Sequence, residues 1–329
     1  MPTTAYGDIS PRTAAYAAKE MLDRAQPYLI LQQFGQLRPI PANSSDTIKF
    51  RRYEALPLAI TPLSEGVTPD GSPMTHTDYQ ATLSQFGDFI TLTDKIADTH
   101  EDPVFKEAQA LVGEQAAQTV ETVLFNILKA GTNVFYSTGT SRAEVADPLS
   151  INMLRKMTRA LKRQNAGYIT SKLSSTANFN TVNVAPSYVA FVHVDLEESV
   201  RALPGFKDVV DYGSMTPYEF EIGSVGDVRF IRSTIIESWA DAGGVAGGNI
   251  STTGANADVY PILLTSKNAF AVTPLKGKNA ITPMVLNPNT PREGDPLGQR
   301  GYVSWKTYFA ACLLNQAWFV RGEVAVPEL

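Results

Sequence analysis

The most regular pattern of apolar and polar positions in the chain lies between Asp102 and Gly131. Apolar residues recur there at intervals of three and four, which predicts one long amphipathic helix. Asp102 is a good N-cap, Pro103 suits the first helical position, and Gly131 would end the helix in a left-handed conformation. Such a helix is about 40 Å long, which is unusual in a globular domain. Its apolar stripe comprises Val104, Ala108, Leu111, Val112, Ala116, Val120, Val123, Leu124 and Ile127.

Residues 1–45 are expected to form an arm. A helix is predicted from Ser10 to about Ala25, and the prolines and the glycine that follow interrupt any longer element. Because such a segment fits poorly inside a compact domain, we interpret it as lying on another surface, such as a neighbouring copy of the chain.

Residues 46–100 begin and end with strand-like patterns, at Thr47–Tyr53 and at Phe89–Thr93. Between them lies an irregular stretch rich in proline and glycine, Pro57–Pro73. The pattern predicts a long two-stranded flap, which is barely stable alone and whose uncovered edges invite pairing with another chain. The candidate contacts with neighbouring subunits in this segment are Lys49, Arg51, Arg52, Asp70, His76 and Asp88.

A second helix is predicted to start at Asp147–Pro148 and to run to about Asn165, with Gly167 as its stop. It is basic, which allows two interpretations: a contact with nucleic acid, or a solvated face whose last cations complement the helix dipole. The second is favoured because no aromatic residues interleave with the cations. These cations are Arg155, Lys156, Arg159, Lys162 and Arg163.

The remaining pattern is mainly strand-forming, so the predicted fold class is α+β. Tyr188–Val194 is almost continuously apolar and should be buried on both faces. Asp195 should cap a short helix that continues to about Leu203. The chain should close with a hairpin of 302–314 and 317–321 that turns at Asn315 and Gln316. Other expected elements are strands at 218–223 and 228–231 joined near Gly226, a glycine-rich loop at 241–257, strands at 260–265 and 269–272, and a loop at 274–298.

Composition and charge narrow the class of protein. A chain of 329 residues with 43% apolar and 19% charged residues is neither disordered nor embedded in a membrane. Its net charge of −5 argues against broad binding to nucleic acid or to anionic lipid. The single cysteine, Cys312, excludes an intrachain disulfide and lies in an apolar run typical of a buried thiol. The start of the chain lacks the pattern of a signal peptide, so we expect synthesis in a reducing cytoplasm.

No motif of known chemistry is recognised in the sequence. His76, His100 and His193 have no metal-ligand spacing and are interpreted as structural. The glycine-rich run Gly243–Gly248 fits neither a dinucleotide-binding nor a phosphate-binding loop. The carboxylate pairs in 197–211 are of a kind that almost any chain of this length contains. We therefore predict no catalytic residue, no cofactor and no metal site, and a protein that is not an enzyme.

Several short motifs occur in order through the second half of the chain: Ala185–Tyr188, His193–Leu196, Glu221–Phe230, Tyr260–Leu263 and Gly298–Thr307. In combination they resemble the major capsid proteins of tailed double-stranded DNA bacteriophages with the Hong Kong 97-type fold, in the family typified by the virion shell protein of coliphage N-four. The order of the expected elements, an arm, a flap, a long helix and a mixed sheet region, is similar to that fold as well. The first 100 residues resemble it by layout rather than by motif.

The resemblance implies a division of the chain into an N-terminal arm, an extended loop, a peripheral domain with a spine helix, and an axial domain at the capsomer centre. The implied boundaries are 1–45 for the arm, 46–100 for the extended loop, 101–149 for the peripheral domain with the spine helix, 150–210 for the axial domain, 211–249 for peripheral-domain strands and a loop, 250–299 for the axial domain, and 300–329 for the peripheral-domain C-terminal strands.

The resemblance also implies the function and the partners. Copies of the chain would form hexamers and pentamers that tile an icosahedral head, and they would contact packaged double-stranded DNA non-specifically. Further implied partners are a portal protein, a separate scaffolding protein and a decoration protein, with no membrane. The protein would be located in the virion capsid, and in the host cytoplasm during assembly.

Two other functions remain open at this point. One keeps the fold and makes the chain the shell of an encapsulin-like compartment that encloses protein cargo. The other is a soluble hydrolase with an unrecognised acid–base pair in the region Asp195–Asp211.

Overall fold

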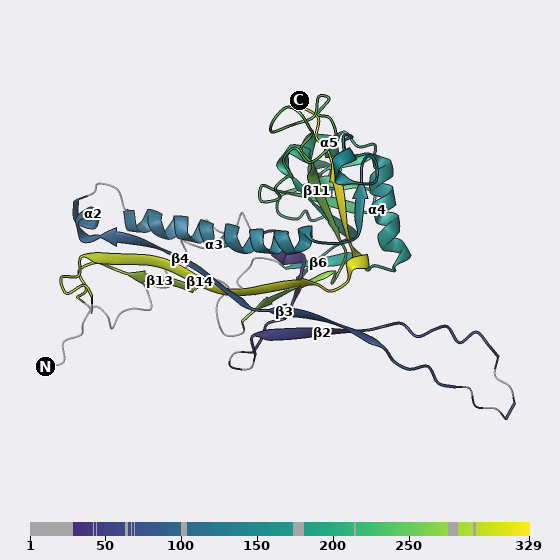
Figure 1. The fold of residues 1–329 in the computed structure, drawn as a ribbon, viewed down its shortest axis with the longest axis horizontal. Coiled ribbons are helices and arrows are strands. Elements are labelled where there is room, and N and C mark those ends of the chain that lie inside the picture. The colour runs from purple at the N-terminus through teal and green to yellow at the C-terminus, as the bar shows by residue number, and fades with distance from the viewer. Residues whose placement is uncertain are drawn as a thin grey trace.

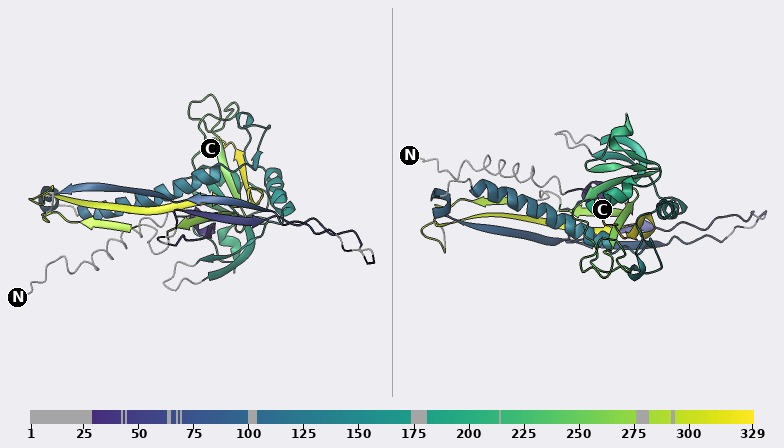
Figure 2. Two further views of the ribbon diagram at one scale, coloured as in Figure 1. Left: turned by 60° about the horizontal axis from the view of Figure 1, so that its bottom comes forward. Right: turned by 90° about the horizontal axis from the view of Figure 1, so that it is seen from above.

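The computed structural model describes residues 29–41, 43, 45–62, 65–66, 68, 70–99, 104–173, 181–213, 215–275, 282–291 and 294–329. The predicted helix from Ser10 to Ala25, the N-cap pair Asp102 and Pro103, and His100 lie outside these residues. Figure 1 shows a long platform, a rounded body above one end of it, and a hairpin that projects past the body. The two further views in Figure 2 show the same elongated platform and the same projecting hairpin.

The predicted long helix is present as α3, Val104–Lys129, which has 26 residues. Its first half packs on the strands of the platform, where Ala108, Val112 and Ala116 meet Trp305. Its second half belongs to a different core, in which Leu124 and other side chains pack beneath the body. One helix therefore joins two cores, and its apolar stripe is continuous because both need it.

The end of α3 corrects the prediction for Gly131, which is not left-handed. The last turn instead tightens, since the Gly131 N–H donates to the Leu128 carbonyl at 3.0 Å. A Cβ at position 131 would lie 3.1 Å from Cδ1 of Phe319 and 3.2 Å from the Leu128 carbonyl oxygen. Glycine is therefore required here by close packing and not by its backbone conformation.

The platform pairs α3 with a five-stranded sheet in the order β1-β12-β14-β13, with β4 on the other side of β14. A short helix, α2 (Asp94–Thr99), leads from β4 toward α3. β13 lies inside the predicted loop 274–298, and its Pro283 obscured it, because proline in a strand is tolerated only where the strand is an edge. The strands are β1 (Gln36–Leu37), β4 (Ser84–Thr93), β12 (Phe270–Pro274), β13 (Thr282–Leu286) and β14 (Arg300–Leu313).

The body is built on an eight-stranded sheet in the order β5-β15-β11-β7-β10-β9-β8, with β6 paired to β7. The predicted strand pair around Gly226 is confirmed as β9 and β10, and Gly226 is left-handed with φ 58°. The strands are β5 (Val134–Tyr136), β6 (Ile169–Leu173), β7 (Thr181–His193), β8 (Phe206–Asp208), β9 (Glu221–Val225), β10 (Val228–Ser233), β11 (Tyr260–Thr265) and β15 (Phe319–Val324).

The sheet of the body is covered on both faces. Tyr188 and Ala190 of β7 point into the core shared with α4 (Ile151–Arg163). Val189 and Phe191 point into the opposite core, shared with α3. This confirms that the almost continuous apolar run of β7 belongs to a strand buried on both sides.

The strand pairing predicted for both hairpins is wrong. β2 (Thr47–Tyr53) pairs with β3 (His76–Thr82), not with Phe89–Thr93, which continues into β4 of the platform. At the C-terminal end, β14 and β15 do not pair but enter different sheets. The turn η7 (Gln316–Trp318), capped by the Asn315 side chain on the Ala317 N–H at 3.0 Å, redirects the chain between them.

Helix ends also differ from the prediction. α4 is capped by Ser150, whose hydroxyl accepts the Met153 N–H at 3.2 Å, and not by Asp147. It ends through Asn165, which is left-handed with φ 51°, and not through Gly167. Asp195 caps no helix. It lies in the 3₁₀ turn η5 (Val194–Leu196), which precedes α5 (Glu197–Arg201).

The two sheets divide the chain differently from the predicted boundaries. β9 and β10, in 211–249, share a sheet with β7 and β11, although these were assigned to another domain. β12 and β13, in 250–299, belong to the platform, and β15, in 300–329, belongs to the body. The remaining 3₁₀ turns are η3 (Leu31–Phe34), η4 (Arg142–Glu144) and η6 (Val209–Tyr212).

Candidate assembly surfaces

The hairpin brings together four of the six predicted contact residues. These are Lys49, Arg51 and Arg52 on β2 and His76 at the start of β3. Asp70 lies in the connecting loop 54–75 and is exposed. Asp88 lies on β4 in the platform, so the six residues do not form one site.

Ion pairs hold the two strands of the hairpin in register. Arg51 donates from Nε and Nη2 to the two carboxylate oxygens of Asp78 at 2.8 and 2.9 Å. This contact lowers the pKa of Asp78 and raises that of Arg51. Thr77 donates to Glu54 at 2.7 Å, which also lowers the pKa of that carboxyl. The cations predicted as contacts therefore have a second role, within their own chain.

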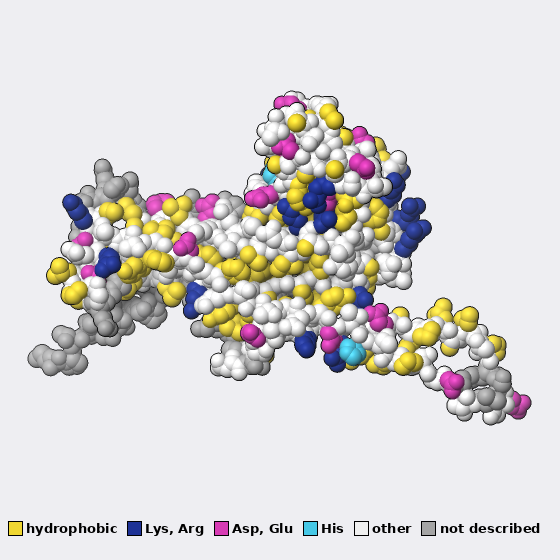
Figure 3. Space-filling model, viewed as in Figure 1, with side chains coloured by type: hydrophobic (Ala, Val, Ile, Leu, Met, Phe, Trp, Pro, Cys, Tyr) yellow, Lys and Arg dark blue, Asp and Glu magenta, His cyan; other side chains and the backbone are white. Residues whose placement is uncertain are grey.

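The hairpin exposes large apolar side chains far from either core. The loop contributes Leu58 at 86% and Ile60 at 83% exposure, and Leu56, Met74 and Tyr53 are exposed as well. Figure 3 shows hydrophobic side chains along the projecting segment. The outer edges of β2 and β3 pair with no other described strand. Apolar side chains and open edges in one segment are features of a surface that another protein covers.

Asp88 connects two elements of the platform. Its carboxylate accepts a hydrogen bond from Gln115 of α3 at 2.6 Å, and this contact lowers its pKa. The side-chain amide oxygen of Gln115, Oε1, in turn accepts from the indole N–H of Trp305 on β14 at 3.1 Å. Asp88 therefore positions β4 against the helix, although its side chain also reaches solvent.

A hollow of about 650 Å³ lies on the face of the platform sheet that points away from α3. It is lined by Phe89 of β4, by Met284 and Leu286 of β13, and by Tyr302 of β14, with Phe89 62% exposed. The Phe89 and Tyr302 rings meet edge to face at 6.0 Å. Sequence reasoning missed this surface, although the alternating pattern of β14 signals a second, half-exposed face.

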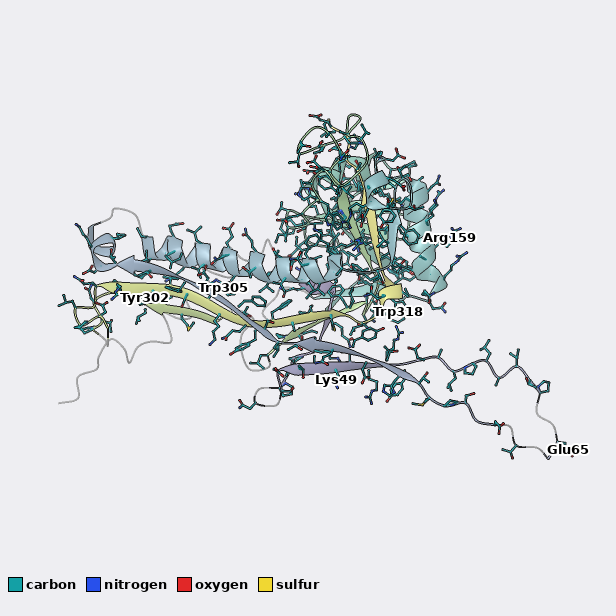
Figure 4. The ribbon with its side chains drawn as sticks, viewed as in Figure 1. Lys49, Glu65, Arg159, Tyr302, Trp305 and Trp318 are labelled. Atoms are coloured by element: carbon teal, nitrogen blue, oxygen red, sulfur yellow. The ribbon has the colours of Figure 1, made fainter. Side chains whose placement is uncertain are left out.

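The basic face of α4 is exposed, as the sequence indicated. Lys162 is paired with Asp227, which raises its pKa, whereas Arg159 points away from the body in Figure 4. The buried side of the helix is apolar and the exposed side is polar or charged along its whole length.

A cluster of cations at the junction of platform and body was not found from the sequence. We call Lys129, Arg142, Trp239, Arg321 and Glu323 the junction cluster. The buried Glu323 carboxylate accepts from Arg142 at 2.7 and 2.9 Å, and Arg321 lies 2.9 Å from it. Three cations surround the Trp239 ring, at 3.6 Å for Arg142, 4.4 Å for Lys129 and 5.6 Å for Arg321. Its members come from four separate segments of the chain, so no local sequence motif could have predicted it.

Among the carboxylates of the region Asp195–Asp211 considered for hydrolysis, Asp195, Glu197 and Asp208 are engaged in structural contacts. His193 Nδ1 lies 3.1 Å from the Asp195 carboxylate, which also accepts from the Tyr260 hydroxyl at 2.7 Å. Asp211 is exposed on η6, apart from this trio. Within the described ranges, no three His, Cys, Asp or Glu side chains are placed to hold a metal ion. No helix in the same ranges is long and apolar enough to cross a membrane.

The sequence was compared with protein-family models and with curated protein sequences. A family model described as phage capsid protein matches residues 77–314, which is well over half of the chain. No curated protein sequence matches the chain.

Three solved structures with a similar fold are of phage capsids or heads. The chain is similar to the capsid of Ralstonia phage GP4, with a TM-score of 0.65 and 12% identity over 90% of this chain and 88% of that one. It is similar to the cyanophage Pam1 capsid, with a TM-score of 0.63 and 13% identity over 93% of each chain. It is similar to the head of Helicobacter pylori bacteriophage KHP40, with a TM-score of 0.59 and 10% identity over 89% and 88% of the two chains. At these identities the likeness shows the fold.

Proposed function

The chain belongs to the phage capsid protein family, and from this premise we propose that its copies assemble into hexamers and pentamers that form the icosahedral head around a double-stranded DNA genome. The protein is structural and not an enzyme. The alternatives of a compartment shell for protein cargo and of a hydrolase are not favoured by the family match.

The observation that carries the proposal is the hairpin of β2, β3 and loop 54–75. A segment that buries only Ala81 among its described apolar side chains, and exposes Leu58 and Ile60 almost completely, is unfavourable for an isolated subunit. In a shell, the same segment gains its contacts from neighbouring copies. Many modest contacts of this kind add up to a stable particle.

We assign the parts of the molecule to the parts of a capsid subunit by their sheets. The platform of α3 and the five-stranded sheet is the peripheral domain, and the body with the eight-stranded sheet is the axial domain at the capsomer centre. The hairpin is the extended loop, and residues 1–45 supply the arm. Our candidates for contact between subunits remain those predicted from the sequence: Lys49, Arg51, Arg52, Asp70, His76 and Asp88. The hollow on the platform sheet is a further candidate surface.

We propose further partners on the same premise. These are a portal protein, a separate scaffolding protein and a decoration protein, with the packaged DNA contacted non-specifically and assembly in the host cytoplasm. The narrower likeness to the coliphage N-four family depends on the motifs between Ala185 and Thr307 and stays a prediction.

Expression of the full chain with size-exclusion chromatography and negative-stain electron microscopy tests the function. We expect capsomers or closed megadalton particles. A monomer or dimer at high concentration would contradict the proposal, and particles that hold a protein cargo instead of nucleic acid would support the compartment.

A further inference from the structure

The junction cluster has more positive charge than its own chain neutralises. Arg142 and Arg321 are both committed to Glu323, and Arg321 also donates to the Lys129 carbonyl at the end of α3. The Lys129 ammonium group makes no ion pair within the described part of the chain. It faces the Trp239 ring at 4.4 Å and the Phe125 ring at 5.2 Å.

The surroundings of Lys129 make a further anion favourable. Partial burial lowers its pKa, and the nearby cations Arg142 and Arg321 lower it as well, against the opposite effects of Glu237 and Glu323. A carboxylate placed beside the ammonium group would relieve both effects. Figure 3 shows the group of basic side chains on the visible face of the molecule, where the body meets the platform.

The loop 54–75 has the complementary composition. It contains the carboxylates of Glu54, Glu65 and Asp70 and no lysine, arginine or histidine. Glu54 is held by Arg52 and Thr77, whereas Glu65 and Asp70 are exposed. Figure 4 shows Glu65 at the tip of the projecting loop. Each leg of this loop can span about 35 Å when extended, which lets the tip reach a neighbouring molecule.

We propose that the acidic tip of this loop, with Glu65 and Asp70, docks on the junction cluster of a neighbouring copy and places a carboxylate beside Lys129. The proposal rests on the proposed function, because it requires shells or capsomers. The basic face of α4 is the competing surface. It offers only polar and charged side chains, whereas the loop is apolar as well as acidic and the junction cluster adds the half-buried Trp239 ring.

Charge reversal on each side tests the docking. Lys129→Glu and the double variant Glu65→Lys/Asp70→Lys should each weaken the contact about tenfold, which corresponds to roughly 1.4 kcal/mol. The yield of closed particles should fall at least tenfold, because each particle contains many such contacts. The triple variant, which restores opposite charges, should recover the yield to within about twofold of the original chain. Yields are measured by sedimentation and by particle counts in negative stain.

Lys156→Glu on the exposed face of α4 is the matched control and should leave the yield unchanged. The loop variants change exposed side chains outside both cores, so they test the proposal even if Lys129→Glu perturbs the subunit. Normal yields from both single-sided changes, a triple variant no better than either, or a loss caused by Lys156→Glu would overturn the docking. If the unchanged chain itself forms no capsomers or particles, the proposed function fails, which is a different result.

Discussion

Two buried glutamates show how single residues hold distant segments together. Glu121 of α3 and Glu323 of β15 both have no solvent exposure. Glu323 is neutralised by Arg142 and Arg321, and removing both partners would leave an uncompensated buried charge. Glu121 forms no ion pair within the described ranges and accepts instead the N–H groups of Ile30 and Leu31. It ties the start of the described chain to the middle of the long helix.

Glu121→Gln should make the stability of the subunit less dependent on pH. Burial raises the pKa of Glu121 to about 8 from 4.5, although the backbone hydrogen bonds act in the opposite direction. The folded state therefore binds this proton more tightly than the unfolded state. The free energy of unfolding then falls as the pH rises from 4.5 to about 8, by at most about 1.4 kcal/mol per pH unit.

Urea unfolding of the unchanged chain and of Glu121→Gln, measured between about pH 5 and pH 8.5, tests this prediction. The range covers most of the pH interval in which this carboxyl titrates. The glutamine variant should lose less stability with rising pH, because its amide oxygen still accepts the two N–H groups and cannot ionise. Glu198→Gln, at an exposed position of α5, is the control and should follow the unchanged chain. Parallel curves for Glu121→Gln and the unchanged chain would contradict the assignment.

At the scale of elements, local sequence patterns predicted single helices and strands correctly. The predictions of which strands pair in the two hairpins failed, because pairing depends on residues far away in the sequence. The spacing of apolar residues gave α3, and the uninterrupted apolar run gave β7. The partner of β2 was missed because His76–Thr82 is mostly polar, whereas Phe89–Thr93 has stronger strand propensity and is used by β14. β13 was missed because of Pro283. A strand's propensity does not say which strand it will pair with.

The same limit applies to the assembly surfaces. The hairpin could be predicted as a reaching segment because a stretch rich in proline and glycine lies between two strand-like patterns. The hollow on the platform sheet needs β4, β13 and β14 side by side, and the junction cluster needs Lys129, Arg142, Trp239 and Arg321 to converge. These contacts are made only by the tertiary fold.

Two glycines that follow helices should respond differently to alanine. Gly131→Ala should destabilise the subunit by about 1–3 kcal/mol, because the new methyl group meets Phe319 and the Leu128 carbonyl. Gly167→Ala should be neutral or stabilising by up to about 1 kcal/mol, since its nearest neighbour would be Lys267 Cβ at 3.8 Å and its φ is not positive. Chemical unfolding of the two variants checks both values, and equal effects would refute the packing argument.

At the scale of the whole molecule, the subunit consists of a platform and a body joined by α3, and of a hairpin that projects from them. The platform core holds Trp305 and Val303, and the body has cores on both faces of its sheet. The hairpin is separable because its strands already meet where the loop begins, with the Glu54 N–H donating to the Thr75 carbonyl at 3.0 Å.

Replacing residues 55–74 by Asn-Gly should leave a folded subunit that forms no closed shells. Asn-Gly favours the tight turn that would join Glu54 to Thr75, and no core side chain is removed. Circular dichroism and the thermal midpoint should match the unchanged chain, whereas electron microscopy should show no particles. Leu58→Ser/Ile60→Ser, which keeps the loop length, separates the effect of apolar contact from that of reach. Normal particles from the shortened chain would refute the role of the loop.

The position of β15 in its sheet has a consequence for biosynthesis. β15 lies between β5 and β11, so the sheet of the body is incomplete until residue 324 has left the ribosome. Arg321 and Glu323, which complete the contacts at the end of α3, are translated in the same late stretch. Nascent chains that have not yet been translated through residue 324 therefore lack a finished body.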